Sequence, residues 1–160
     1  MAKGTNNIAF TAPINPAGAT KILTKSQVWA GLLLKIRSAE TFTAKAIEST
    51  TVLSESVDAE GNPVTEREIV FRADHRKAKD TVTVYEDSRV DFVQSDGSKI
   101  FNVLSEGAEG ELFLTYVFEW RHPGVGAEEL KAFKDKEIKM GNAVKETVDV
   151  MRELVVKGEL

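Results

Sequence analysis

The chain has 160 residues, a formal net charge of −4 at pH 7 and no cysteine. This length suits one domain with a buried core, so we expect a single domain over residues 1–160. The absence of cysteine excludes disulfides, thiolate catalysis, iron–sulfur clusters and cysteine-bound zinc. A mildly acidic chain without a basic cluster is a poor candidate for binding nucleic acid or anionic membranes.

The N-terminal residues lack the apolar region of a signal peptide, and the most apolar run, Val28 to Leu34, is far shorter than the ~20 residues of a membrane span. We therefore expect a cytoplasmic protein.

The first part of the chain is predicted to form a strand and then a helix. Asn7 to Ile14 alternate apolar side chains with polar or small ones, which is the period of a strand. Thr24 and Gln27 have the spacing of a helix-capping box. The helix that follows has one apolar face, made of Trp29, Leu32, Leu33 and Ile36. A short helical turn is expected around residues 40–43.

From Ala46 onward the apolar period changes to two, which predicts a series of strands. The predicted strands are Ala46–Ser54, Thr65–Arg72, Thr81–Tyr85, Arg89–Val93, Lys99–Ser105 and Glu111–Arg121. The connections contain turn residues such as Asp96 and Gly97, which suit the positive φ angles of a tight hairpin. Short loops between consecutive strands predict an antiparallel meander.

The C-terminal segment from about Ala127 to Val156 is predicted to be one long helix. Its apolar residues recur with helical spacing: Leu130, Phe133, Met140, Val144, Val148, Met151 and Val155. A long antiparallel sheet twists and coils, and a helix with a single apolar stripe needs a cover. We therefore predict the α+β class and a helix-grip fold, in which a curved antiparallel sheet of about seven strands surrounds the long C-terminal helix. The space between them is a natural ligand cavity.

Four segments carry a resemblance to a known family. They are FTAPINP at 10–16, LTKSQVWAGLLLK at 23–35, RVDFVQ at 89–94 and LFLTYVFEWR at 112–121. The order of elements resembles that of the START-like (SRPBCC) superfamily, which includes the birch-pollen allergen, lipid-transfer domains and aromatic polyketide cyclases. The four segments are similar to its AtaL-like branch, which is mostly fungal, and the resemblance covers nearly the whole chain. It implies a role in secondary metabolism on a polyketide or related aromatic intermediate, but it transfers no catalytic residue.

The last predicted strand supplies candidate ligand contacts. Strict alternation places Tyr116, Phe118 and Trp120 on one face together with Leu112 and Leu114, and this face is expected to line the cavity. The two leucines are expected to be plain core. Tyr116 and Trp120 each carry a polar group that needs a partner when buried, and such groups orient ligands. The alternative is that both aromatic residues are core as well.

Two polar side chains interrupt apolar strand faces. Arg67 alternates with Ile69 and Phe71, so it is predicted to point inward, where an unpaired charge is very costly. We predict that Arg67 is catalytic and holds a ligand carboxylate, phenolate or enolate. The alternative is a salt bridge, or a side chain that reaches water at the end of the sheet. Asn102, between Ile100 and Leu104, is predicted to polarise a ligand carbonyl or else to satisfy a strand irregularity.

Glu137 falls within the apolar stripe of the long helix, between Phe133 and Met140. Burial disfavours the charged form of a carboxyl group, and a carboxyl group tuned toward neutrality is a good general acid or base. We predict that Glu137 is the second catalytic residue and that Gly141, one turn further, leaves room for a ligand. The alternative is that the first turns of the helix overhang the sheet, so that Glu137 reaches water or pairs with Arg67.

His75 and His122 are the only histidines, and both are expected in solvated loops. We therefore predict no metal site, and no cofactor is expected. The leading hypothesis is a cofactor-independent enzyme that cyclises, isomerises or dehydrates a hydrophobic or aromatic metabolite. The alternatives are a non-catalytic carrier of such a ligand and an adaptor that acts through a protein surface. A small hydrophobic or aromatic molecule is the expected partner, without nucleic acid or membrane, and a monomer or homodimer is expected.

Overall fold

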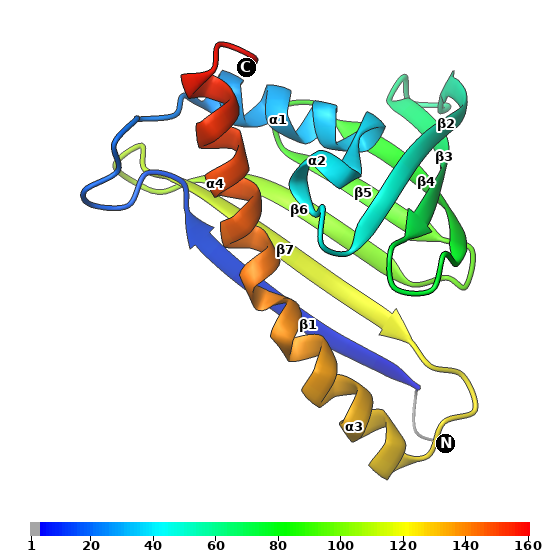
Figure 1. Cartoon of the computed structure of the whole chain (residues 1–160). Coiled ribbons are helices and arrows are strands. Elements are labelled where there is room, and N and C mark those ends of the chain that lie inside the picture. The colour runs from blue at the N-terminus through cyan, green and yellow to red at the C-terminus, as the bar shows by residue number, and fades with distance from the viewer. Residues whose placement is uncertain (1–3) are drawn as a thin grey trace.

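One seven-stranded antiparallel sheet and the helices that cover it make up the fold of this chain, in a computed structural model that describes residues 4–160 (Figure 1). In chain order the elements are β1 (Thr5–Pro13), α1 (Lys25–Arg37), α2 (Ala39–Phe42), β2 (Ile47–Val57), β3 (Pro63–Phe71), β4 (Lys77–Tyr85), β5 (Arg89–Gln94), β6 (Lys99–Glu106), β7 (Leu112–Arg121), α3 (Ala127–Glu137), the 3₁₀ turn η1 (Ile138–Gly141) and α4 (Asn142–Val156). The predicted strands and helices are all present, and their bounds differ from the predicted ones by a few residues.

The strand order is β1-β7-β6-β5-β4-β3-β2, so the predicted meander runs from β2 to β7 and β1 joins it beside β7. The sheet curves, and α1 and α4 lie against its inner face (Figure 1). Buried residues of both helices and of the sheet form one core cluster. This arrangement confirms the predicted α+β helix-grip fold.

Helix α1 begins where its sequence predicts, and three residues of its predicted apolar face, Trp29, Leu32 and Ile36, are buried, but the fourth, Leu33, is exposed because it points away from the sheet. The Thr24 hydroxyl accepts a hydrogen bond from the Gln27 backbone N–H, and the Gln27 side chain accepts one from the Thr24 N–H, which completes the capping box. Trp29 is buried on the inner face of the helix. A Cβ atom on Gly31 would lie 2.8 Å from the Met151 side chain, so glycine at this position lets α1 approach α4 closely.

The long C-terminal helix is present but is not one regular α-helix. Its first part, α3, buries no residue, and the apolar stripe is buried only from Val144 onward. The 3₁₀ turn η1 separates α3 from α4, and a Cβ atom on Gly141 would lie 2.6 Å from the Phe10 ring. Glycine is a poor helix former, and here it admits a neighbouring aromatic ring. Met140, predicted as part of the stripe, is 44% exposed because α3 and η1 lie beyond the main core.

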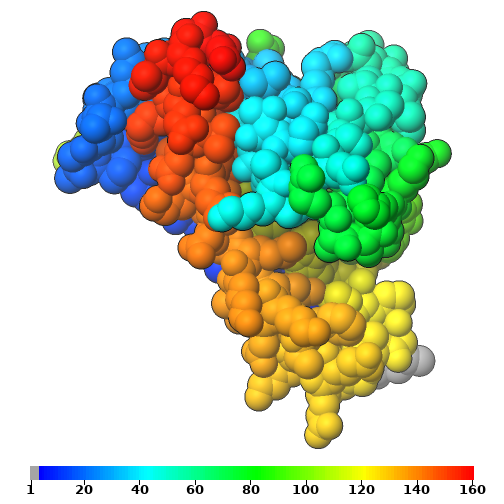
Figure 2. Space-filling view, in the orientation of Figure 1, coloured from blue at the N-terminus to red at the C-terminus, as the bar shows by residue number. Residues whose placement is uncertain are grey.

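The α3 end of the molecule projects from the rest as a narrower lobe (Figure 2). In the space-filling view, α3 and the segment that follows β7 form this lobe, while α1, α2 and the β2–β4 hairpins form the broad end. Within residues 4–160, no helix combines the length and the apolar character that a membrane crossing requires.

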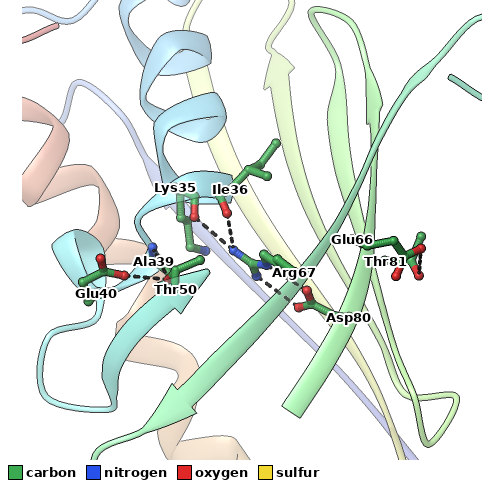
Figure 3. A network of polar contacts seen from close by, with 9 residues as sticks. All are labelled: Lys35, Ile36, Ala39, Glu40, Thr50, Glu66, Arg67, Asp80 and Thr81. Carbon is green, nitrogen blue, oxygen red and sulfur yellow. Dashed lines mark hydrogen bonds and ion pairs between the residues drawn. The ribbon is translucent and has the colours of Figure 1, made fainter. Parts of the chain in front are cut away.

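A buried ion pair fixes the C-terminal end of α1 on the sheet (Figure 3). The Arg67 Nε and Nη2 atoms donate to the two carboxylate oxygens of Asp80 at 2.8 and 3.1 Å. The Nη1 atom of Arg67 donates to the backbone carbonyls of Lys35 and Ile36 at 3.1 and 2.9 Å. Carbonyl groups at the end of a helix have no hydrogen-bond donor within the helix, and here Arg67 is the donor. The pair therefore joins β3, β4 and α1.

Polar contacts also hold α2 against β2 in the same view (Figure 3). The Thr50 hydroxyl accepts from the Ala39 N–H at 3.0 Å and donates to a Glu40 carboxylate oxygen at 2.6 Å. The segment from α1 to β2 is therefore anchored at both of its ends.

We expect Trp29→Ala to lower the free energy of unfolding by about 3–5 kcal/mol, since it removes a large buried aromatic side chain from the core. Leu33→Ala on the same helix is the matched control, because Leu33 is 39% exposed. Urea denaturation followed by circular dichroism measures both values. A loss of less than about 1 kcal/mol for Trp29→Ala would mean that this face of α1 is not core.

We expect Arg67→Met and Asp80→Leu each to lower the free energy of unfolding by about 3–5 kcal/mol, because either change leaves one buried charge without its partner. The double variant should lose less than the sum of the two single losses, since it removes both charges together. Urea denaturation of the three variants measures this coupling. Additive losses in the double variant would show that the pair does not act as a unit.

Candidate functional site

A cavity of about 740 Å³ lies between the inner face of the sheet, the segment from α1 to β2, and α4. This volume is in the range of about 300–1,000 Å³ that is typical of small-molecule sites. Aromatic side chains form much of the wall toward the sheet, and polar or charged side chains from α1, β3, β4, η1 and α4 also line it. The lining includes Lys35, Arg67, Asp80, Phe92, Tyr116, Phe118, Trp120 and Met140.

Lys35, in the last turn of α1, is at the centre of a chain of hydrogen bonds. Its Nζ atom donates to the Asn102 Oδ1 atom at 2.9 Å and to the Tyr116 hydroxyl at 2.8 Å. The Tyr116 hydroxyl donates to the Thr147 Oγ1 atom at 2.7 Å, and the Thr147 hydroxyl donates to the Ala143 carbonyl at 2.8 Å. This series of hydrogen bonds therefore connects α1 through β6 and β7 to α4.

The amine of Lys35 has neutral hydrogen-bond acceptors but no counter-ion. Among residues 4–160, no carboxylate lies within ion-pair distance of its Nζ atom, and the Asp80 carboxylate is engaged by Arg67. The pKa of Lys35 is lowered to about 7, mainly by burial and to a smaller extent by the charge of Arg67, while the charge of Asp80 acts in the opposite direction. Lys35 keeps some accessible surface because it borders the cavity. Its amine is thus able to exchange a proton near neutral pH.

Tyr116 remains a neutral phenol. Burial raises the pKa of its hydroxyl, while the hydrogen bond with Thr147 acts in the opposite direction and is the weaker influence. The Nζ atom of Lys35 also lies 4.3 Å from the centre of the Tyr116 ring, which is a cation–π distance. Tyr116 therefore holds the amine of Lys35 both through its oxygen and through its ring.

Two buried N–H groups at the site have no acceptor among the described residues. They are the Trp120 indole Nε1 and the Asn102 side-chain Nδ2. The Trp120 ring lines the cavity and stacks on Phe118 with ring centres 5.5 Å apart. A buried donor without a partner is costly, and buried polar groups in proteins are nearly always satisfied. The Nε1 atom of Trp120 has almost no accessible surface, so this donor is enclosed in the wall even though the ring lines the cavity.

The structure brings most of the sequence-predicted residues together. Tyr116, Phe118 and Trp120 lie on the cavity wall, as their shared strand face indicates. Asn102 is fully buried and holds Lys35. Arg67 also borders the cavity, but four of its N–H directions are taken by Asp80 and by two backbone carbonyls. Of the roles considered for Arg67, the structure thus shows a salt bridge, and its partner is Asp80 on the next strand.

Glu137 lies outside the lining of this cavity, in a polar cluster beneath α3. Its Oε1 atom is 2.5 Å from the His122 Nε2 atom, and its Oε2 atom accepts from the Asn6 side chain at 2.8 Å. The alternative that the first turns of the helix overhang the main core agrees with α3, which buries no residue, but Glu137 pairs there with His122 and Asn6 and not with Arg67. The catalytic role of Glu137 stays a prediction that this geometry does not support.

Two further expectations need correction. His122 is not a solvated loop residue, since it stacks on Phe133 with ring centres 4.4 Å apart and contacts Glu137. Gly141 makes room for the Phe10 ring and does not line the large cavity. His75 does lie exposed in a turn, where it pairs with Glu48.

Sequence reasoning missed Lys35 and Asp80. Lys35 follows Val28 by seven residues and Leu32 by three, so helical spacing places it on the buried face of α1. Asp80 alternates with Val82 and therefore points inward on β4. The sequence pattern therefore contained the information that both side chains point inward. Asp80 was missed because the predicted strand began only at residue 81.

Comparisons with known proteins agree with this fold. No curated protein matches the sequence significantly. Among solved structures, the chain is similar to an AHSA1-like protein from Aeromonas hydrophila, with a TM-score of 0.51 and 13% identity over 97% of this chain and 96% of that one. It is also similar to Ara h 8.0201, with a TM-score of 0.56 and 13% identity over 96% of this chain and 99% of that one. At these identities the likeness shows the fold alone.

Residues 8–158 match the family AtaL, described as acetylaranotin biosynthesis cluster protein L. The chain therefore belongs to the AtaL family, as the resemblance of its sequence predicts.

Proposed function

We propose that this protein binds a small hydrophobic or aromatic metabolite in its large cavity and acts on it as a cofactor-independent cyclase, isomerase or dehydratase in secondary metabolism. The observation that carries the proposal is a buried amine, that of Lys35, which faces a cavity of about 740 Å³ without a carboxylate partner among residues 4–160. The family description, which names a biosynthesis cluster protein, supports a metabolic role.

The polar groups of the cavity suit reactions that move protons on a bound carbonyl compound. With a pKa of about 7, Lys35 is able to give or take a proton at neutral pH, and such transfers contribute roughly 10²–10⁴-fold to a rate. The Trp120 ring, which lines the cavity, adds an aromatic surface on which an apolar ligand can pack. The aromatic wall holds an apolar ligand in one conformation, which lowers the entropic barrier of a cyclisation.

A non-catalytic carrier is the second candidate, and one observation favours it. The carboxylate of Asp80, which borders the cavity, has both oxygens bound by Arg67, so it is not placed to act on a ligand. The volume of the cavity argues against the third hypothesis, an adaptor whose interior is filled by side chains. Cytoplasmic location and a monomeric or dimeric state stay predictions.

Native mass spectrometry of the protein purified from its own host tests the proposal, because a bound metabolite adds a defined mass to the chain. The identified compound, incubated with the protein, should be converted to a product. Conversion supports an enzyme, and binding without conversion supports the carrier. An empty protein that also fails to bind small aromatic compounds contradicts both.

We expect 8-anilinonaphthalene-1-sulfonate, an aromatic anion, to bind in the cavity with enhanced fluorescence. Val150→Trp should weaken its binding by more than about tenfold, since Val150 lines the cavity from α4 and the larger ring fills part of it. Val156→Trp is the matched control on the same helix, because Val156 is 68% exposed. Equal affinity for the two variants would place the probe outside the cavity.

We expect the affinity for the same probe to fall by about tenfold as the pH rises from 5.5 to 8.5, because an ammonium group attracts the sulfonate and a neutral amine does not. The pKa of Lys35, about 7, lies within this window, so its charge is present at the lower pH and absent at the higher one. Lys35→Met should remove the pH dependence, and Lys145→Met, which changes an exposed lysine of α4, should preserve it. Fluorescence titration at several pH values measures the effect. An unchanged pH profile in Lys35→Met would assign the titration to another group.

A further inference from the structure

We infer that Lys35 is a nucleophile that forms an imine with the carbonyl group of a ligand bound in the cavity. The inference rests on the proposed function because it uses the same cavity. It narrows the ligand to a hydrophobic or aromatic aldehyde or ketone. It also assigns the central chemical step to a residue that sequence reasoning did not identify.

The direction of the hydrogen bonds leaves the lone pair of the Lys35 amine free. Thr147 uses its hydroxyl hydrogen on the Ala143 carbonyl, so its oxygen accepts from Tyr116. Tyr116 uses its hydrogen on Thr147, so its oxygen accepts from Lys35. Asn102 presents its carbonyl oxygen to Lys35 and also accepts. A neutral amine has two hydrogens and one lone pair. Both hydrogens have acceptors, and the lone pair has no donor among the residues that the structure describes.

The groups around Lys35 keep a large share of the amine neutral at physiological pH. The charged or titratable groups that face it are Arg67 on β3, Asp80 on β4 and Tyr116 on β7, and Thr147 is the group that faces it from α4. The cavity also has Lys139 from η1 and Glu146, Asp149 and Glu153 from α4 on its wall. With a pKa of about 7, half of the amine is neutral at pH 7. A solvated lysine, with a pKa near 10.4, is neutral in only about one molecule in 10³.

The reaction needs no external oxidant or reductant. The lone pair of the Lys35 Nζ atom attacks the carbonyl carbon and forms a C–N bond, and a proton moves from nitrogen to the former carbonyl oxygen. The resulting carbinolamine has one hydroxyl group and one N–H. Loss of the hydroxyl group together with the nitrogen-bound proton releases one water molecule and forms the C=N bond. Hydrolysis by one water molecule reverses the step and restores the lysine.

An imine at this position would give the site an electron-withdrawing group made from one of its own residues. A protonated imine withdraws electrons from the neighbouring carbon, so that a C–H bond there loses its proton more readily than in the parent carbonyl compound. The carbanion equivalent that results is the species from which an isomerisation, a dehydration or a ring-closing attack on a second carbonyl group proceeds. The cyclase, isomerase and dehydratase reactions proposed above share this requirement.

Reductive trapping tests the inference directly. The full-length protein at pH 7 is incubated with benzaldehyde and sodium cyanoborohydride, and in parallel with formaldehyde and the same reductant. Peptide mapping by mass spectrometry then measures the modification rate of each lysine. We expect Lys35 to be modified at least about tenfold faster than Lys145, which is exposed and paired with Asp149. The rate at Lys35 should reach half of its maximum near pH 7 and not near pH 10.

Wild-type protein alone decides the outcome, because all lysines are compared within one chain. Lys35→Met should lose the fast modification and Lys145→Met should retain it, provided that circular dichroism shows both to be folded. Formaldehyde is small enough to reach any group that borders a cavity of this size. If neither aldehyde modifies Lys35 faster than Lys145, the inference is wrong. The proposed function survives that result when 8-anilinonaphthalene-1-sulfonate still binds in the cavity, and both fail when it does not.

Discussion

The buried contact between the Arg67–Asp80 pair and the end of α1 is the constraint on which the rest of the site depends. Arg67 holds the carbonyl groups of Lys35 and Ile36, so it fixes the last turn of α1 against β3 and β4. The side chain of Lys35 is thereby directed toward β6 and β7, where Asn102 and Tyr116 receive it. Arg67 is therefore best described as a positioning residue. Its positive charge also contributes to the low pKa of the Lys35 amine.

Keeping the Lys35 amine in this place costs stability. Its pKa is about 7 in the folded chain, whereas the unfolded chain has the ordinary value of 10.5. Between these two values the unfolded state holds a proton that the folded state has released, so the stability of the fold rises with pH through this window. Below pH 7 the folded chain carries the buried charge and the full penalty remains. A fold that retains such a group on the wall of a large cavity keeps an unfavourable feature in one place. A ligand that interacts with the amine would relieve it, and this is the physical argument for a functional site.

Local patterns were sufficient to predict the fold, and they predicted part of the site. The capping box at Thr24 and the alternation along β7 are each determined by neighbours in the sequence, so their structural consequences followed correctly. Alternation along β3 also predicted correctly that Arg67 points inward, but it could not identify the partner of Arg67. Asp80 is 13 residues away and meets Arg67 only through the pairing of β3 with β4. Lys35 was overlooked because a lysine in the last turn of a helix usually has a simple role, the stabilisation of the helix dipole. Glu137 was misplaced because helical spacing cannot show where a long helix leaves the sheet.

The division of the C-terminal helix separates two tasks that one regular helix would combine. Helix α4 packs its apolar stripe on the sheet and supplies Thr147, which orients the Tyr116 hydroxyl and through it the Lys35 amine. Helix α3 buries nothing and is held at its end by the contacts of Glu137 with His122 and Asn6. The 3₁₀ turn between them brings Met140 to the cavity wall, half exposed, at the point where core packing ends. A water-poor interior is needed for an amine to stay neutral, and a route for the ligand is needed beside it. Tight packing along α4 meets the first requirement. The segment that precedes it, from Ala127 to Gly141, buries no residue, so a displacement there to admit a ligand would disturb the core least.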